Sequence, residues 1–190
     1  MNIFVGEHRL PAAAPATARV IANFAAFQIG WFACVLGAAH DLPWAGTAVA
    51  AAIVAAHIGT AARPLQELKL VVIALLIGTV WDSALIALGW LDFKSGFLVH
   101  GMAPHWILAL WALFATTLNF SLGWLKARLP AAVVLGAVAG PLAYWGGASL
   151  GAVSLVEPLP AAAALSAGWA LFTPLLVLLA RRHDGMRTAD

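Results

Sequence analysis

The fold is decided by the stretch Leu70–Leu91, which reads LVVIALLIGTVWDSALIALGWL. Its one charged residue is Asp82, and the charges Lys69 and Asp92 stand directly outside its two ends. An α-helix rises about 1.5 Å per residue, so about 20 apolar residues cross a hydrocarbon core roughly 30 Å thick. The stretch therefore predicts a transmembrane helix.

Five further stretches have the same length and character. Each is bounded by residues that interrupt an apolar run, such as Arg63-Pro64 and Glu157-Pro158. We therefore predict an all-α fold, a polytopic membrane bundle of six transmembrane helices that forms a single integral membrane domain over residues 1–190. The predicted helices are Val20–Ala39, Trp44–Ala62, Leu70–Leu91, Pro104–Leu125, Ala131–Gly151 and Leu159–Ala180.

The composition supports a membrane protein. The chain has 190 residues, of which 63% are hydrophobic and 9% charged, and its mean hydropathy is +0.94, whereas soluble domains carry about 25% charged residues. The net charge of +2 is small and its Lys and Arg residues are scattered, so we expect no nucleic-acid partner. The single cysteine, Cys34, excludes an intramolecular disulfide and lies in an apolar run, where we expect an inert thiol.

The distribution of positive charge predicts an orientation. Nine of the ten Lys and Arg residues fall in the N-terminal arm, in the second and fourth loops or in the C-terminal tail, and only Lys94 falls in the opposite loops. Because cytoplasmic segments retain Lys and Arg, we predict that both termini are cytoplasmic (N-in, C-in). Residues 1–19 would be a cytoplasmic arm, 20–180 the bundle, and 181–190 a cytoplasmic tail.

Small residues recur every fourth position in several predicted helices. Such stripes let helix backbones approach closely. They favour packing within the bundle, and a homo-oligomer or a membrane partner joined through one stripe is the alternative. The stripes are Ala22, Ala26, Gly30, Cys34 and Ala38; Ala48, Ala52, Ala56 and Thr60; Gly136 and Gly140; and Gly147 and Gly151.

Asp82 is the strongest candidate for a functional residue. Counted from Lys69, it lies roughly 20 Å into the bilayer, where a carboxylate costs about 2.5–3.5 kcal/mol unless it faces the bundle interior. Other polar or aromatic residues fall at a similar depth, and they would form a ligand pocket around Asp82. The alternative is a structural carboxylate that is satisfied by Tyr144, Ser83 or a helix backbone. These candidate ligand-binding residues are Trp111, Tyr144, Trp145 and Ser166.

A second polar layer is predicted nearer the cytoplasm. It contains Asn23, His57 and Asn119, roughly 6–12 Å from the boundary. Asn and His side chains hydrogen-bond across membrane helices, so this layer would hold the helices together. The alternative is the mouth of a pocket, or a proton relay from His57 towards Asp82.

Neither a metal nor a cofactor is expected. His40, His100 and His105 fall near the outer side without the close spacing of metal ligands. Phosphate-binding glycine loops and the zinc motif HExxH do not occur in the sequence. The catalytic residues of an enzyme are therefore unknown, and the sequence leans against one.

Three segments resemble the DUF2878 family. They are NFAAFQIGWFACVLG at Asn23–Gly37, APHW at Ala103–Trp106 continuing through LWALFATTLNFSLGW at Leu110–Trp124, and GPLAYWGG at Gly140–Gly147. The resemblance covers nearly the whole chain from Ala22 to Ala180, and it implies a small bacterial inner-membrane protein of unknown function. It provides no catalytic residues, but it suggests a link to membrane-lipid modification.

Three functions fit these features. The chain could bind or carry a small apolar or lipid-like molecule in an intramembrane pocket around Asp82. It could be a membrane enzyme, or an accessory subunit of one, in fatty-acyl modification or stress response. It could also be a scaffold without a ligand. Binding or carriage fits best, because a scaffold needs no intramembrane carboxylate.

Overall fold

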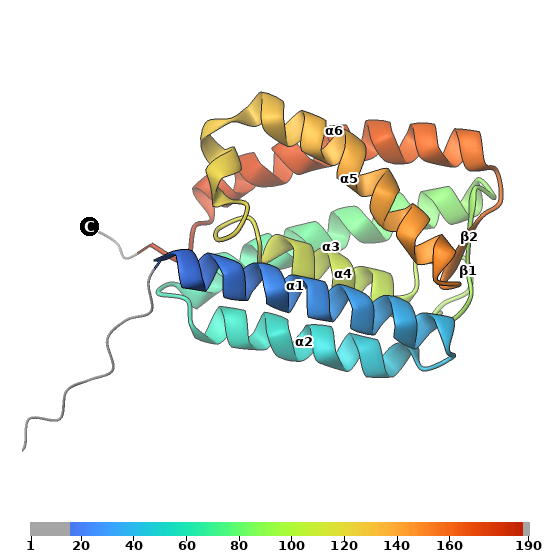
Figure 1. Ribbon diagram of the computed structural model, residues 1–190, viewed down its shortest axis with the longest axis horizontal. Coiled ribbons are helices and arrows are strands. Elements are labelled where there is room, and N and C mark those ends of the chain that lie inside the picture. Colours follow the sequence, from blue (N-terminus) through green and yellow to red (C-terminus); the bar gives the residue numbers. More distant parts are fainter. Residues whose placement is uncertain (1–15, 188–190) are drawn as a thin grey trace, which may run out of the picture.

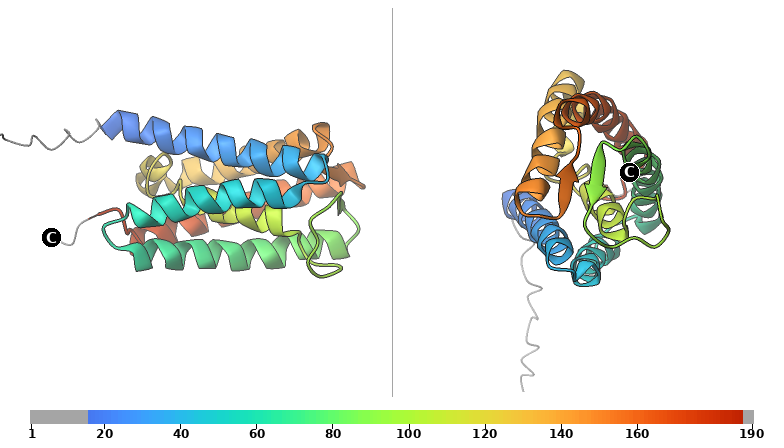
Figure 2. Two further views of the ribbon diagram at one scale, coloured as in Figure 1. Left: turned by 90° about the horizontal axis from the view of Figure 1, so that it is seen from below. Right: turned by 90° about the vertical axis from the view of Figure 1, so that its right-hand side faces the viewer.

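The computed structural model describes residues 16–187, and it forms a bundle of helices that run broadly along one direction (Figures 1 and 2). The start of α1 and the end of α6 lie at the same end of the bundle (Figure 1). Most of the predicted arm, residues 1–15, lies outside the described residues, and so do residues 188–190 of the predicted tail. The elements are α1 (Ala16–Ala39), α2 (Pro43–Gly59), α3 (Pro64–Ala87), β1 (Leu91–Phe93), α4 (His105–Ala115), the 3₁₀ helix η1 (Gly123–Ala127), α5 (Leu129–Ser149), β2 (Val153–Leu155) and α6 (Pro158–Arg182).

Four of these helices, α1, α3, α5 and α6, are long and apolar enough to cross a membrane. The helices α2 and α4 are apolar but shorter, with 17 and 11 residues. The predicted helical membrane bundle is confirmed to that extent. Six crossings and the N-in, C-in orientation remain predictions.

The prediction of one helix over Pro104–Leu125 is wrong beyond Ala115. There the chain leaves the helix and passes through turns into η1. The hydroxyls of Thr116 and Thr117 donate to the carbonyls of residues 113 and 114, and such side-chain bonds compete with helix continuation. The residues of this non-helical segment are buried or half-buried by protein, which is where irregular backbone is tolerated at membrane depth.

Two other predicted helices have different ends. Helix α3 begins at Pro64 instead of Leu70, because proline at the first helical position costs no hydrogen bond. Two short strands lie at the opposite end of the bundle. Strand β1 begins at Leu91, the predicted last residue of the Leu70–Leu91 helix, and β2 follows the predicted helix Ala131–Gly151. These strands pair antiparallel, with Asp92 opposite Ser154, and so join the two halves of the chain.

Helix α4 is the centre of the bundle. It packs against α1, α2 and α3, while α5 packs mainly on α6, and α6 also contacts α3. Glycines permit the closest approaches: a Cβ on Gly46 would overlap the backbone of α1, and one on Gly136 would overlap the backbone of α6. The small-residue stripe of α1 is buried at Gly30, Cys34 and Ala38, which supports packing within the bundle. The stripe of α2 is exposed at its three alanines, residues 48, 52 and 56.

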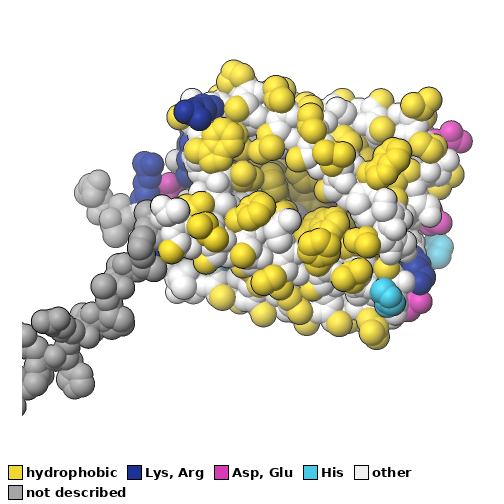
Figure 3. All heavy atoms as spheres, in the orientation of Figure 1, with side chains coloured by type: hydrophobic (Ala, Val, Ile, Leu, Met, Phe, Trp, Pro, Cys, Tyr) yellow, Lys and Arg dark blue, Asp and Glu magenta, His cyan; other side chains and the backbone are white. Residues whose placement is uncertain are grey.

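The charged side chains divide between the two ends of the bundle. Lys and Arg gather at the end where α1 begins, whereas acidic and His side chains dominate the opposite end (Figure 3). At that opposite end, Lys94 forms an ion pair with Asp41 at 3.1 Å. The structure therefore segregates charge along the bundle axis in the pattern that the sequence predicts.

Candidate functional site

Asp82 lies at the junction of three helices. Trp111 Nε1 of α4 donates to Asp82 Oδ2 at 2.7 Å, and the Tyr144 hydroxyl of α5 donates to Asp82 Oδ1 at 2.5 Å. The carboxyl group is fully buried. Both of its oxygens therefore have a partner, as a buried carboxyl group requires.

The orientation of Trp111 depends on the helix that carries Asp82. Gly78 lies one turn before Asp82, and a Cβ at that position would overlap the indole ring of Trp111. On its other side the ring stacks on Trp169 of α6, with ring centroids 4.6 Å apart and an interplanar angle of 15°. Gly140 of α5 allows Trp169 a similarly close approach, because a Cβ at that position would overlap the Trp169 side chain. Packing against the indole therefore orients the Trp111 N–H towards Asp82.

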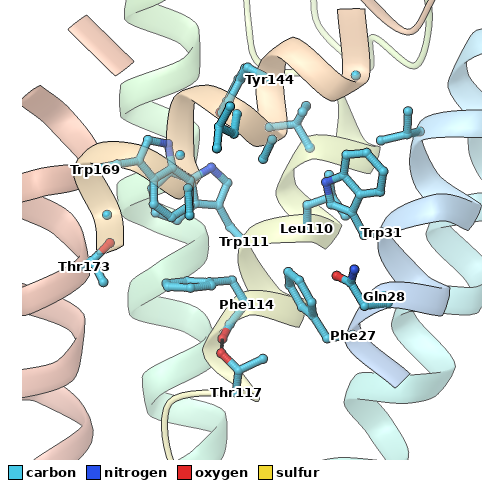
Figure 4. Close-up of a pocket in the computed structure, with 18 of the residues that line it drawn as sticks. Phe27, Gln28, Trp31, Leu110, Trp111, Phe114, Thr117, Tyr144, Trp169 and Thr173 are labelled. Atoms are coloured by element: carbon cyan, nitrogen blue, oxygen red, sulfur yellow. Dashed lines mark hydrogen bonds between the residues drawn. The ribbon is translucent and has the colours of Figure 1, made fainter. Parts of the chain in front are cut away.

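A cavity of about 470 Å³ lies in front of this group. Trp111 and Tyr144 line the cavity but Asp82 does not, so the carboxyl group stands behind the cavity wall. Figure 4 shows Trp111 and Trp169 on one side of the cavity and Trp31 on the other. Its aromatic lining residues also include Phe24, Phe27, Trp106 and Phe114.

The cavity lies between α1 and α5. Helix α5 runs obliquely to α1, close to it near β2 and apart from it at the other end (Figures 1 and 2). The face over these two helices is hollowed in Figure 3. The surrounding surface is apolar, with exposed side chains such as Phe24, Val138 and Leu142. The cavity is therefore open sideways, in the direction from which a lipid-soluble molecule would come.

One buried hydroxyl lines the cavity without a partner. Thr173 Oγ1 has no hydrogen-bond partner among the described residues, and Thr173 is 2% exposed. Figure 4 shows it beside the tryptophan pair. An unpaired buried hydroxyl costs free energy, so Thr173 is a place where a bound molecule could form a hydrogen bond.

Two candidate residues are not brought to Asp82. Trp145 points outwards and is 60% exposed. The Ser166 hydroxyl donates to the backbone carbonyl of Ala137 at 2.9 Å. Pro141 lies four residues after Ala137 and has no N–H to offer that carbonyl, so Ser166 supplies the donor that the proline lacks.

The second polar layer divides into two groups. His57 and Asn119 meet at Glu67, a fully buried carboxylate in the first turn of α3. His57 Nε2 lies 2.9 Å from Glu67 Oε2, and Asn119 Nδ2 donates to Glu67 Oε1 at 2.6 Å. The backbone N–H of Gly185 also donates to Oε1, at 2.8 Å. These bonds fasten the segment after α6 to α3.

Asn23 braces the interrupted end of α4. Its Nδ2 donates to the carbonyl of Thr116 at 3.2 Å, and its Oδ1 accepts from the Ser121 hydroxyl at 2.7 Å. The backbone N–H of Ser121 donates to the same oxygen at 3.3 Å. Asn23 therefore satisfies backbone groups that the end of the helix leaves free.

The segment after α6 contains a third buried acidic residue, Asp184. Lys126 of η1 donates to Asp184 Oδ2 at 2.9 Å. Burial acts to raise the pKa of Asp184. The hydrogen bond and positive charge of Lys126, together with smaller effects of the Met186 backbone N–H and of Arg187, outweigh it, so the pKa lies below its ordinary value. Asp184 is therefore ionised at neutral pH and holds the segment against η1.

Sequence reasoning missed Glu67 and Asp184. Glu67 was hidden because the helix was expected to begin at Leu70; the signal that reveals it is Pro64, which places Glu67 in the first turn. No local pattern identifies Asp184, whose partner lies 58 residues earlier in the chain. The structure places His105 beside Thr47, with His105 Nδ1 2.7 Å from the Thr47 hydroxyl. Among residues 16–187, no group of three or more His, Cys, Asp or Glu side chains could hold a metal ion.

Membrane-length helices around a laterally open apolar cavity define the class: a helical protein of the membrane type with an internal cavity. The chain belongs to the DUF2878 family, described as a protein of unknown function, whose model matches residues 20–175. The family resemblance seen in the sequence is thereby confirmed. The comparisons with curated proteins and with solved structures give no significant match.

Proposed function

We propose that this protein binds or carries a small apolar or lipid-like molecule in the cavity between α1 and α5. The observation that carries the proposal is the cavity itself, about 470 Å³ in volume with an aromatic wall. Ligand sites typically measure about 300–1,000 Å³ and combine an apolar lining with few polar groups. A cavity open towards lipid would admit a molecule that is already dissolved in the bilayer.

Asp82 has a positioning role in this proposal. It fixes Trp111 and Tyr144, whose rings form part of the wall, from behind. The ligand would touch those rings and the Thr173 hydroxyl rather than the carboxyl group. Trp145 and Ser166 would act elsewhere, Trp145 towards lipid and Ser166 on the α5 backbone.

We also infer that all six helices are embedded in the membrane, with the basic end of the bundle in the cytoplasm of a bacterium and the chain in its inner membrane. The segregation of Lys and Arg to the end of the bundle where α1 begins supports this orientation. Cys34 is buried and should not react with a membrane-impermeant maleimide. In intact cells that reagent should label Leu98→Cys, whereas Thr60→Cys should be labelled only after lysis. The opposite result would reverse the orientation.

The ligand can be sought directly. Protein extracted in a mild detergent should retain a small molecule that mass spectrometry of the denatured protein releases and identifies. A palmitic acid probe that carries a diazirine group should crosslink to peptides of α1, α4 and α5, which line the cavity. Crosslinks confined to the outer face of α2, with no retained molecule, would refute the proposal.

A further inference from the structure

A second cavity, of about 330 Å³, lies at the basic end of the bundle. Five residues line it: Arg63 before α3, Lys126 of η1, Arg181 of α6, and Asp184 and Arg187 from the segment after α6. They come from parts of the chain more than 50 residues apart. The fold therefore gathers four cationic side chains around one small space.

Internal contacts hold three of these cations in place. A guanidinium N–H of Arg63 donates to the carbonyl of Asp184 at 2.5 Å. Lys126 donates to Asn119 Oδ1 and to Asp184 Oδ2, and Arg181 donates to the carbonyl of Lys126. Each guanidinium carries five N–H groups, so both arginines keep donors for another acceptor.

The charges in this cavity do not balance. Asp184 is the only carboxylate among the five lining residues, and it is shared by Lys126 at 2.9 Å and Arg187 at 3.3 Å. Glu67, whose carboxyl group contacts His57 and Asn119, adds at most one further negative charge against the four cations. Cations brought together without enough counter-charge repel one another. An anion placed in the cavity would relieve this repulsion.

We propose that the second cavity binds a phosphate group, supplied by the headgroup of an anionic phospholipid. Arginine matches the geometry of phosphate oxygens with paired N–H donors. Basic cavities between helices at the cytoplasmic surface are a known way to hold anionic lipid headgroups. The end of α6 and the exposed Trp124 of η1 place the cavity near the expected bilayer interface. The site is separate from the apolar cavity and does not depend on what that cavity binds.

The test compares two lipids that differ only in phosphate. Native mass spectrometry of the purified protein should show binding of dioleoyl phosphatidic acid and at least about tenfold weaker binding of dioleoylglycerol. In Arg63→Gln/Arg181→Gln, binding of phosphatidic acid should fall about tenfold or more, because charge-assisted bonds to phosphate are lost. Arg187→Gln, whose side chain is 80% exposed, should weaken binding without loss of fold.

The matched control is Arg128→Gln/Arg182→Gln. It removes the same charge at the same end of the bundle, from residues that do not line the cavity. It should keep binding within about twofold of the wild type, a difference well under 1 kcal/mol. An equal loss in this control, or equal binding of the two lipids, would overturn the proposal.

The source of the phosphate is tested by competition. Glycerol 3-phosphate in large excess presents the same group without acyl chains. If it leaves phosphatidic acid bound, the lipid assignment is supported. If it displaces the lipid from the wild type, the site takes a soluble phosphate and the lipid assignment is overturned.

Discussion

Asp82 and Tyr144 are 62 residues apart in the chain, yet the Tyr144 hydroxyl donates to the Asp82 carboxyl group at 2.5 Å inside the bundle. The bond links α3 to α5, two helices that otherwise pack mainly on other partners. Trp111 donates a second hydrogen bond to Asp82. Two side chains of the cavity wall, Trp111 and Tyr144, are therefore positioned by Asp82, which does not line the cavity itself.

Removal of Asp82 should destabilise the bundle more than removal of the Tyr144 hydroxyl. Asp82→Ala leaves two buried donors unpaired, whereas Tyr144→Phe removes one donor from a carboxyl group that keeps another. We expect losses in the free energy of unfolding of about 3 kcal/mol and about 1–2 kcal/mol. Denaturation in mixed micelles measures both. The control is Trp145→Phe, at the neighbouring position but directed outwards, which should lower the free energy of unfolding by under about 0.5 kcal/mol. If Tyr144→Phe lowered it by as little, the hydrogen bond from Tyr144 to Asp82 would be contradicted.

Gly78→Ala should displace the indole of Trp111. The new methyl group would overlap the ring that Gly78 accommodates, and such overpacking costs about 1–3 kcal/mol. Near-ultraviolet circular dichroism should report the altered tryptophan environment. Gly59→Ala is the control, because a Cβ there meets nothing within 4 Å. Equal stability and equal spectra for the two variants would show that the Trp111 indole does not pack against Gly78.

Ser166 and Pro141 should be energetically coupled. Ser166→Ala removes the donor to the Ala137 carbonyl, at a cost of about 0.6–1.7 kcal/mol, as for other hydrogen bonds between membrane helices. In Pro141→Ala the backbone regains an N–H that can serve that carbonyl. The cost of Ser166→Ala should therefore shrink in the Pro141→Ala background. A double-mutant cycle measures the difference, and strictly additive costs would count against the explanation.

The attachment of the segment after α6 should weaken in acid. The pKa of Asp184 is lowered in the folded protein, so its stabilising effect is complete above the unfolded value of about 3.9 and is lost as the pH falls through the lower folded value. Stability measured from about pH 5 downwards should thus fall more steeply in the wild type than in Asp184→Asn. Parallel pH profiles for the two proteins would mean that Asp184 does not fasten this segment.

The sequence predicts well whatever depends on local composition. Apolar runs such as Leu70–Leu91 identify the long helices, because lipid requires about 20 apolar residues per crossing. The separation of Lys94 from the other nine cations predicts the charge distribution along the bundle. Depth along the helices also places Trp111 and Tyr144 near the level of Asp82, and in the structure both side chains donate hydrogen bonds to its carboxyl group.

Features that depend on long-range contacts are less predictable. The helix expected over Pro104–Leu125 ends early at Thr116 and Thr117, and the backbone groups freed there are satisfied by Asn23 on another helix. Neighbours on opposite faces of a helix have nearly the same depth, so Trp145 and Tyr144 fall in one predicted layer although their side chains point in different directions. The position of Asp82 behind the cavity wall depends on how the helices pack. The periodicity of the sequence alone does not predict it.

If the cavity between α1 and α5 holds a lipid-like molecule, Ala143→Trp should exclude that molecule. Ala143 lines the cavity, so an indole there should fill part of the space, whereas Ala163→Trp adds the same group on the outer face of α6. Crosslinking of the palmitic acid diazirine probe to purified protein, normalised to folded protein, is the measurement. We expect at least about a tenfold loss of labelling for Ala143→Trp and wild-type labelling for Ala163→Trp. Equal labelling of the two variants would show that the cavity does not hold the probe.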